Sequence, residues 1–372
     1  MQSRRAGGSF GLANTFVDAP YECLVAITDF DHGDNVSEVT RPLRSLLYMP
    51  ASNAKAIAKS RTLDCDAVIF DLEDAVAPNE KDAARVRAVE AVQAGDFGNR
   101  TVVVRVNGLS TPWGEADFRA VAECAPDAIL VPKVSSAAEV RACHELMSAF
   151  PANTQLWIMI ETARSIFNLA EIADVASETR LAAFVLGTND LCKETNARLV
   201  PGRAAVMPLI ALAVTAGKMA NLAVIDGVYN SIEDTAGFEA ECHQGLEYGC
   251  DGKTLIHPGQ IAIANRAFSP TEAEVTFAKA VIEAFSLPEN ADAGRPACRR
   301  KDGRAAASRA MQEVVRDRRR HSRGPQSGSP CGKRSVNWNG RLSETALKNS
   351  VSPASAELLH YLIAHTASET GE

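Results

Sequence analysis

Eight short apolar runs, separated from one another by longer alanine-rich segments, constrain the fold of this 372-residue chain more than any other feature. Runs rich in Val, Ile and Leu are typical of parallel strands buried on both faces, and the longer segments have the spacing of crossover helices. We therefore predict an α/β fold of the (β/α)8 TIM barrel type. The predicted strands are residues 45–51, 67–74, 101–107, 128–134, 155–162, 181–191, 222–229 and 252–258. The predicted helices are residues 53–64, 79–96, 114–125, 136–149, 163–178, 204–220 and 233–249, with a last helix at 270–286 that closes the barrel.

The same pattern divides the chain into three parts. Residues 1–42 show no clear periodicity and are predicted to be an N-terminal extension, and residues 43–287 are predicted to form the barrel. Residues 288–372 form an atypical Arg-rich C-terminal tail, which we expect to be poorly ordered because it holds little apolar material. Within the tail, only residues 353–366 have the pattern of an amphipathic helix.

Charge and cysteine content exclude several classes of protein. The net charge is -7, yet residues 295–334 hold 13 Lys and Arg against three acids, so the barrel itself is acidic. An acidic barrel argues against general nucleic-acid binding, and it requires a few well-placed cations to hold an anionic substrate. No apolar run is long enough to span a membrane and no signal-peptide pattern is visible, so we expect a cytoplasmic protein. The nine cysteines, without a C-x-x-C pair, are expected to be reduced packing residues.

Polar side chains gather where the predicted strands end, which is where TIM barrels carry their chemistry. We expect them to converge at one mouth of the barrel. These residues are Asp71, Glu73, Asp74, Arg105, Asn107, Lys133, Glu161, Asp190 and Asp226.

Two of these acids, Glu161 and Asp190, are the candidate metal ligands. Strand alternation puts Glu161 on one face with Met159, and Asp190 follows Gly187, where the chain can turn. Two carboxylates completed by water and substrate oxygens match the octahedral shell of Mg²⁺, and no His/Cys cluster has zinc spacing. The alternative is that Glu161 caps the helix starting near Ala163 while Asp190 caps the next turn.

Arg105 is the candidate substrate-binding cation. It shares a strand face with Asn107 in an otherwise apolar run, so its guanidinium is expected to be buried and suited to gripping a carboxylate or carbonyl oxygen. The alternative is a structural ion pair with an acid of the preceding strand, such as Glu73. Asp71 and Glu73 share a face and would repel each other unless Arg105, Lys133 or a metal lies among them.

Lys133 and His257 have simpler interpretations. A Schiff-base role for Lys133 is disfavoured by its acidic neighbours, which would keep it charged, so we expect it to balance charge. His257 ends the last predicted strand, and a hydrogen-bonded structural role is favoured over a catalytic one. No Gly-rich phosphate loop is visible, so nucleotide-binding folds are set aside.

Seven motifs in order resemble the citrate lyase β-subunit-like branch of the HpcH/HpaI aldolase superfamily, which includes malyl-CoA and citramalyl-CoA lyases. The resemblance covers about 44 to 286. The motifs are RSLLYMPASN at 44–53, DLEDAVAP at 71–78 with Lys81 and Arg85, RVNGLSTPWG at 105–114, VPKV at 131–134, MIET at 159–162, LGTNDL at 186–191 and GKTLIHPGQI at 252–261.

This resemblance implies a Mg²⁺-dependent carbon–carbon lyase of the (β/α)8 type. Its substrate would be a carboxylated 3-hydroxyacyl-CoA such as malyl-, citramalyl- or citryl-CoA, cleaved to an α-oxo acid by retro-Claisen chemistry, in a homotrimer or hexamer. Glu161 and Asp190 match the family's metal ligands, with Glu161 also facing substrate. Arg105 matches the substrate-binding arginine, and Tyr48 and Lys59 match positions that contact CoA. We assign catalytic roles to Arg105 and Glu73.

The tail departs from the family. The lyases carry a C-terminal lid with a Gly-Lys/Arg-Met/Leu-Val/Ile-Asp/Glu motif that supplies an acid/base group, whereas this chain has Asp302-Gly303-Arg304-Ala305-Ala306-Ala307. Two alternatives to lyase activity therefore stay open. One is a CoA thioester hydrolase acting on the same substrates, and the other is a catalytically impaired barrel whose basic tail binds an anionic partner.

Overall fold

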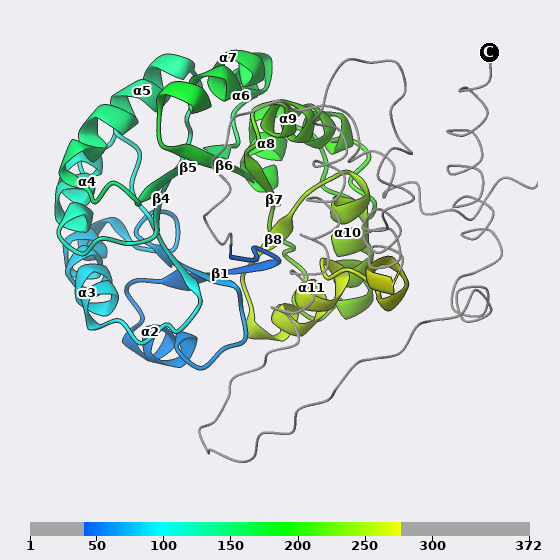
Figure 1. Ribbon diagram of the computed structural model, residues 1–372, viewed down its shortest axis with the longest axis horizontal. Coiled ribbons are helices and arrows are strands. Elements are labelled where there is room, and N and C mark those ends of the chain that lie inside the picture. The colour runs from blue at the N-terminus through cyan, green and yellow to red at the C-terminus, as the bar shows by residue number, and fades with distance from the viewer. Residues whose placement is uncertain (1–40, 277–372) are drawn as a thin grey trace, which may run out of the picture. The chain divides into compact units, whose positions relative to one another are not determined.

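The computed structural model describes residues 41–276, and within them eight parallel strands close into a barrel in sequence order, with β8 paired to β1 (Figure 1). Each of the eight predicted strands is present, so the (β/α)8 prediction is confirmed. The strands are β1 (Ser45–Pro50), β2 (Ala67–Asp71), β3 (Thr101–Arg105), β4 (Ala128–Val131), β5 (Gln155–Ile160), β6 (Leu181–Leu186), β7 (Ala223–Asp226) and β8 (Gly252–Leu255).

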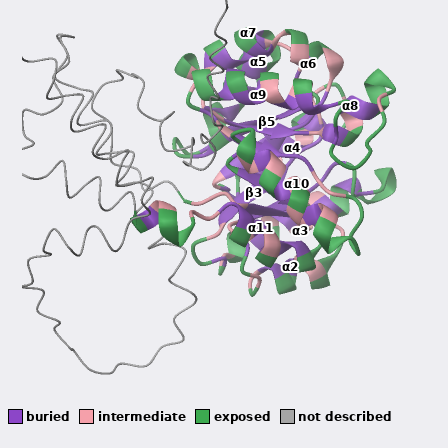
Figure 2. Cartoon of the chain, turned by 90° about the vertical axis from the view of Figure 1, so that its right-hand side faces the viewer, coloured by how far each residue is buried: buried purple, intermediate pink, exposed green. Residues whose placement is uncertain are grey.

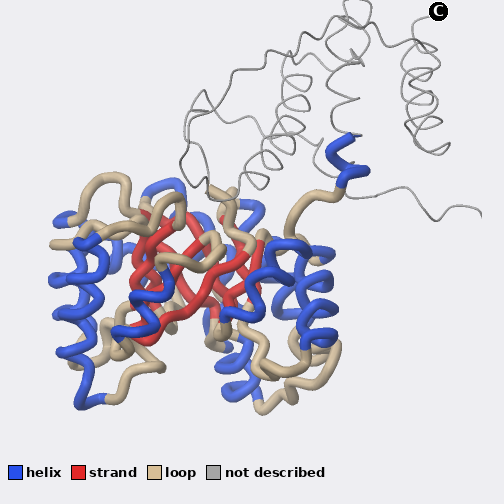
Figure 3. The backbone as a smooth tube through the Cα atoms, turned by 90° about the horizontal axis from the view of Figure 1, so that it is seen from below, coloured by secondary structure: helices blue, strands red, loops and turns tan. Residues whose placement is uncertain are grey.

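Helices follow the strands and surround the barrel, as the tube in Figure 3 shows. The α-helices are α2 (Ala54–Ser60), α3 (Lys81–Ala94), α4 (Gly114–Ala122), α5 (Ala137–Leu146), α6 (Ala163–Phe167), α7 (Leu169–Asp174), α8 (Thr188–Thr195), α9 (Met207–Met219), α10 (Thr235–Glu247) and α11 (Ile261–Ala267). Short 3-10 turns are η1 (Pro78–Glu80), η2 (Met147–Ala149), η3 (Val175–Glu178) and η4 (Pro258–Gln260). The predicted helix 163–178 is broken at Asn168, and α8 and α11 were not predicted.

The strands are shorter than predicted at their carboxyl ends. The predicted strand 181–191 ends at Leu186, and its last residues begin α8 instead, so Asp190 lies in the first turn of a helix. The reason is local: the apolar run stops at Leu186, and Gly187 then turns the chain into the helix. Glu73 and Lys133, which lie beyond the ends of β2 and β4, are on loops.

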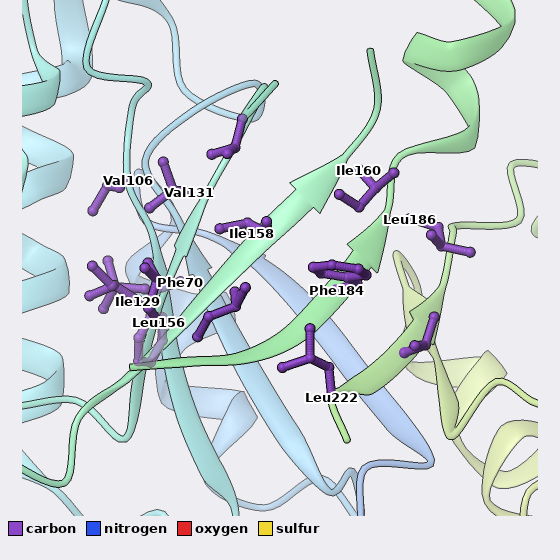
Figure 4. Close-up of a cluster of buried hydrophobic side chains, with 14 of the residues drawn as sticks. Phe70, Val106, Ile129, Val131, Leu156, Ile158, Ile160, Phe184, Leu186 and Leu222 are labelled. Atoms are coloured by element: carbon purple, nitrogen blue, oxygen red, sulfur yellow. The ribbon is translucent and has the colours of Figure 1, made fainter. Parts of the chain in front are cut away.

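Strand alternation separates two apolar cores. The barrel interior is filled by inward-facing side chains from alternate strand positions. These are Leu46, Ala67, Ile69, Val103, Ala128, Leu130, Trp157, Met159, Ala183, Val185 and Ile225. The outward-facing side chains pack against the helices and form the larger core, which Figure 4 shows with Phe70, Ile158, Phe184 and their neighbours. Figure 2 shows the strands buried and the outer faces of the helices exposed. A barrel interior filled in this way leaves room for ligands only at the ends of the strands.

Six cysteines of the described region are free and buried, as expected for packing residues: Cys65, Cys124, Cys143, Cys192, Cys242 and Cys250. No helix within residues 41–276 is long and apolar enough to cross a membrane.

Chain contacts delimit one compact unit, Ser37–Ser269, which holds the whole barrel. Residues 270–276 belong to a second unit, and residues 272–276 are helical, in agreement with the start of the predicted helix 270–286. The remainder of that helix, the tail 288–372 with its predicted helix 353–366, and almost all of the extension 1–42 lie outside the described residues. The predicted domain limits therefore stay predictions.

Candidate active site at the carboxyl ends of the strands

The centre of the barrel mouth is a buried ion pair between neighbouring strands. Asp71 ends β2 and Arg105 ends β3, and the two residues are paired in register. Arg105 donates from Nε to Oδ1 of Asp71 at 2.7 Å and from Nη2 to Oδ2 at 2.6 Å. Its side chain is only 8% exposed. The bidentate pair fixes the guanidinium plane and leaves Nη1 as the end available to other groups.

Asp71 is therefore the main ion-pair partner of Arg105, and Glu73 makes a second contact with it. Asp71 also accepts hydrogen bonds from the backbone N–H groups of Glu73 at 2.9 Å and Ala75 at 3.0 Å, which folds the loop after β2 back over the mouth. Burial opposes the charge on Arg105, but Asp71 outweighs it and holds the pKa of the guanidinium well above its usual range. Arg105 is a permanent cation here.

Tyr48 supports this pair from inside the barrel. The Arg105 guanidinium lies over the Tyr48 ring, 4.8 Å from its centroid, which is a cation–π contact. The Tyr48 hydroxyl is buried and has no hydrogen-bond partner among the described residues. Burial raises the pKa of this hydroxyl, so it stays protonated. Lys59, the other predicted CoA contact, is exposed on α2.

Glu73 and Lys133 extend the ion pair across the mouth. Glu73 accepts a hydrogen bond from Lys133 Nζ to Oε1 at 2.7 Å, and its Oε2 lies 2.9 Å from Nη1 of Arg105. Lys133 Nζ is also 3.9 Å from Oδ2 of Asp190. Burial raises the pKa of Glu73 although both cations oppose the shift. Burial also disfavours the charge on Lys133, but the Glu73 carboxylate keeps its pKa raised. Lys133 is charged and bridges two acids.

Glu161 is the most strongly perturbed acid of the mouth. It follows β5, is buried, and accepts a hydrogen bond from the backbone N–H of Lys133 to Oε1 at 2.8 Å. Lys133 has a left-handed backbone with φ of 57°, which a non-glycine residue adopts at a cost. Burial, with the negative charge of Glu73, raises the pKa of Glu161 to about 8. A buried carboxylate in this state lacks a sufficient counter-charge.

Gly187 makes room for that carboxylate. A Cβ at position 187 would collide with the Glu161 side chain, so only glycine fits beside it. Three residues on, Asp190 presents a carboxylate that is 31% exposed from the first turn of α8. Glu161 and Asp190 thus come from the ends of neighbouring strands, β5 and β6.

Neither acid serves as a helix cap. Thr162 caps α6, with its hydroxyl accepting from Ser165 N at 3.0 Å, and Gly187 precedes α8 without a side-chain cap. Residues 41–276 contain no group of three or more His, Cys, Asp and Glu side chains that could enclose a metal. A cation held by Glu161 and Asp190 would therefore keep several positions for water or ligand oxygens, which is how Mg²⁺ is usually bound.

Charge balance gives an independent test of whether a cation fits. We call Asp71, Glu73, Arg105, Lys133, Glu161 and Asp190 the mouth cluster. Its four carboxylates face two cations, so it carries two formal negative charges, while Asp74 is nearby but 64% exposed. A divalent cation would neutralise this excess, and the residues present therefore fit Mg²⁺.

Two residues expected at the mouth lie elsewhere. Asp226 ends β7 but faces outward, where Arg203 Nη1 donates to it at 2.8 Å and Lys253 Nζ at 2.8 Å. The expectation was wrong because its neighbour Ile225 faces the interior, so alternation turns Asp226 towards α10. Asn107 contacts Asp117 of α4 instead of sharing the face of Arg105, because the strand ends at Arg105 and alternation ends with it.

His257 makes the hydrogen bond of a structural residue, as predicted. It is exposed at the end of β8, and its Nδ1 accepts a hydrogen bond from Gly259 N at 3.1 Å, which caps η4. Sequence reasoning gave no role to a second set of polar residues, Lys81, Trp113 and Asp117, which lie on the helix side of the mouth. The only signal was that Lys81 follows the acidic motif at 71–78.

Comparisons with known proteins identify the family and the fold. Residues 44–258 match the family model HpcH/HpaI aldolase/citrate lyase. A (3S)-malyl-CoA thioesterase from Cereibacter sphaeroides strain KD131 is 48% identical over 248 residues, which cover 67% of this chain and 85% of that protein. The citrate lyase subunit beta of Escherichia coli strain K12 is 33% identical over 252 residues, which cover 66% of this chain and 83% of that protein.

Solved structures show the same fold with ligands. The protein CitE from Mycobacterium tuberculosis, in complex with magnesium, acetoacetate and coenzyme A, has a TM-score of 0.58 and 26% identity, covering 74% of this chain and 98% of that one. A citrate lyase beta subunit from M. tuberculosis complexed with oxaloacetate and magnesium has a TM-score of 0.53 and 27% identity, covering 62% and 98%. With its barrel, its strand-end carboxylates and a family model matched over more than half its length, the chain belongs to the HpcH/HpaI aldolase/citrate lyase family.

Proposed function

We propose that this chain is a Mg²⁺-dependent acyl-CoA lyase that cleaves or forms the carbon–carbon bond of a carboxylated 3-hydroxyacyl-CoA of the malyl-CoA type. The observation that carries the proposal is the mouth cluster, in which two cations and four carboxylates leave an excess of two negative charges at the strand ends. The relatives named for malyl-CoA and citrate support this class of substrate.

Glu161 and Asp190 would hold the metal. Their carboxylates come from adjacent strand ends, and the raised pKa of Glu161 marks a charge that lacks compensation. When bound, Mg²⁺ supplies positive charge that polarises a substrate oxygen. Related structures complexed with magnesium and an oxo acid support this assignment.

Arg105 would bind the oxo-acid half of the substrate. Asp71 holds Nε and Nη2, so Nη1 is the donor left for a carboxylate or carbonyl oxygen. Nη1 carries two N–H groups, so the ligand would bind beside Glu73, whose Oε2 lies 2.9 Å from Nη1. Lys133, with a side chain 52% exposed, would attract the same anionic group from the open side of the mouth.

Glu73 would act as the acid/base group. In the cleavage direction its carboxylate takes the proton of the substrate hydroxyl, the carbon–carbon bond breaks, and a carbonyl forms on the oxo acid. The enolate of acetyl-CoA then receives that proton on carbon from Glu73, so no net proton is gained or lost. A carboxylate whose pKa is raised by burial is suited to carrying a proton in both directions.

Thioester hydrolysis is the second candidate. It is favoured by one specific observation: the relative that is 48% identical is named a (3S)-malyl-CoA thioesterase. The mouth cluster would serve both reactions, because both develop negative charge on an oxygen near the metal. The difference lies in the bond that breaks, carbon–carbon or carbon–sulfur.

The test is a product analysis with the full chain. Malyl-, citramalyl- and citryl-CoA are incubated with Mg²⁺, and free thiol and oxo acid are measured in parallel. A lyase forms acetyl-CoA and an oxo acid without free thiol, whereas a hydrolase forms free CoA and no oxo acid. Both activities should disappear with EDTA and return with Mg²⁺. A chain that converts none of these esters, although it is folded and loaded with Mg²⁺, would refute the proposal.

A further inference from the structure

Lys81 lies on the helix side of the mouth with its ammonium group fully engaged. It is the first residue of α3, and it is only 6% exposed. Its Nζ donates to the backbone carbonyl of Leu72 at 2.8 Å, to the carbonyl of Glu73 at 2.7 Å and to Oδ1 of Asn107 at 2.8 Å. Three bonds use all three donors of an ammonium group.

The acceptors of Lys81 are themselves fixed from outside the barrel. Asn107 donates from Nδ2 to the Leu72 carbonyl at 3.0 Å and to Oδ2 of Asp117 at 2.6 Å. Asp117, buried on α4, also accepts from Asn107 N at 2.9 Å and from Arg85 Nε at 2.6 Å. The loops after β2 and β3 are thus tied to α3 and α4 by one connected set of hydrogen bonds.

This set holds the backbone of Glu73 from both sides. Its N–H donates to Asp71 in the barrel mouth, and its carbonyl accepts from Lys81 on the helix side. The Glu73 carbonyl also accepts from Val76 N at 3.1 Å, and the side chain of this held residue lies between Arg105 and Lys133. Lys81 itself contacts no other member of the mouth cluster through its side chain.

We propose that Lys81 is a positioning residue, which sets the Glu73 carboxylate between Arg105 and Lys133 by holding the loop that carries it. The role in turnover rests on the proposed function, because it assumes that Glu73 acts on substrate. Burying the charge of a lysine costs folding free energy, and a neutral donor could satisfy neutral carbonyl acceptors equally well. Stability alone therefore does not explain a lysine at this position. Replacing it should therefore disturb the chemistry more than the binding of the CoA portion.

The first experiment is a double-mutant cycle in the full chain with Lys81→Met and Glu73→Gln. We expect Lys81→Met to lower kcat about a hundredfold, because a displacement of roughly 1 Å at a reacting group has that effect. KM for the CoA ester should change much less. If Lys81 acts through Glu73, the double variant should be as active as Glu73→Gln alone. Multiplicative losses would show that Lys81 acts independently and would overturn the proposal.

A matched control separates positioning from stability. Arg44 forms a bidentate ion pair with Asp66, at 2.8 Å for both bonds, at the opposite end of the barrel. Arg44→Met also removes a cation from a half-buried pair, so it should lower the melting temperature while kcat stays near wild type. An equal loss of kcat in Arg44→Met would assign the effect of Lys81→Met to general destabilisation. Lys81→Gln, which keeps two N–H donors, replaces the Met variant if that variant does not fold.

A crystal structure of Lys81→Met decides the point without any turnover. The expected result is a Glu73 carboxylate displaced from Arg105 Nη1 and Lys133 Nζ, which it meets at 2.9 Å and 2.7 Å in the native chain. An undisturbed carboxylate would overturn the positioning role. Absence of turnover in the native chain would instead refute the proposed function and leave this structural result standing.

Discussion

Two ionic clusters of the barrel contain the same kinds of residue and differ in how their charges are compensated. The mouth cluster faces the barrel opening. The second, which we call the wall cluster, lies between β7, β8 and α10 and consists of Arg203, Asp226, Glu241 and Lys253. Its two acids and two cations balance. Burial opposes the charge of Asp226, yet Lys253 and Arg203 hold the pKa of that carboxyl below its usual range.

In the mouth cluster, the pKa values of Glu73 and Glu161 move the other way. Burial raises the pKa of Glu161 and of Glu73, because two cations do not compensate four carboxylates. The wall cluster is buried and balanced in charge, whereas the mouth cluster is partly exposed and carries an excess of negative charge. A buried ionic group whose charges balance stabilises the fold, whereas one with an excess of negative charge has the charge needed to attract a cation.

The largest effect is expected at Glu161 and Asp190, the proposed metal ligands. Glu161→Ala or Asp190→Ala should abolish Mg²⁺-dependent turnover, because each variant removes one of two ligands and half of the excess charge. The barrel should stay folded, since neither side chain caps a helix. Steady-state kinetics and circular dichroism measure the two effects, and Glu239→Gln, at an exposed ion pair on α10, serves as the control. Near wild-type activity in either ligand variant would mean that the metal assignment is wrong.

The wall cluster should give the opposite result. Asp226→Ala leaves the buried cations Arg203 and Lys253 without their shared carboxylate, which typically costs about 3–5 kcal/mol of stability. Denaturant unfolding measures the loss, and the folded fraction should keep its activity per molecule. A selective loss of turnover without a loss of stability would place Asp226 in the chemistry and break the distinction between the two clusters.

Arg105→Lys tests the grip on substrate within the mouth cluster. Lysine keeps the charge but cannot bind Asp71 through two parallel bonds, so the donor for the substrate is no longer fixed. We expect binding of the oxo-acid half to weaken about tenfold to hundredfold, the value of a charge-assisted hydrogen bond, with little change for CoA. Calorimetric titration with each half separately makes the measurement. Equal weakening of both halves would indicate a structural role.

The smallest effect is a difference in pH dependence. Glu161 binds a proton in the metal-free folded state up to about pH 8 but loses it near pH 4.5 when unfolded, so folding stability should fall as pH rises between these values. The slope is at most about 1.4 kcal/mol per pH unit, and Glu161→Gln should remove it. Asp226, with a lowered pKa, stabilises above its usual value near 3.9 and loses that contribution only as pH falls below it. Unfolding in EDTA from pH 5 to 8 measures the Glu161 effect, and an extension of the series below pH 4 measures the Asp226 effect. An unchanged slope between pH 5 and 8 in Glu161→Gln contradicts the charge imbalance.

A site residue could be predicted from the sequence where the alternation of a strand fixes the direction of its side chain. Glu161 and Arg105 were placed because alternation continues to the last residue of a strand or just past it. The predicted positions of Asn107 and Asp226 were wrong because alternation does not bring either residue to the mouth. Asn107 lies beyond the end of its strand, and Asp226 is at an outward position. Because Ile225 is an apolar residue that faces the barrel interior, alternation predicts that the next residue, Asp226, faces outward. The resemblance included Lys81 with the motif at 71–78, but the contacts of this lysine could not be predicted, because two of its three acceptors are backbone carbonyls.

The sequence by itself determined the eight strands, most of the helices between them and the family, because these follow from local apolar patterns and from short motifs. Only the tertiary structure decided which charges compensate one another. The bidentate bond of Arg105 to Asp71, the bridge of Lys133 to Glu73 and the uncompensated Glu161 arise from groups up to 60 residues apart in the chain. Electrostatic balance depends on distance and burial, and both are set when the barrel closes.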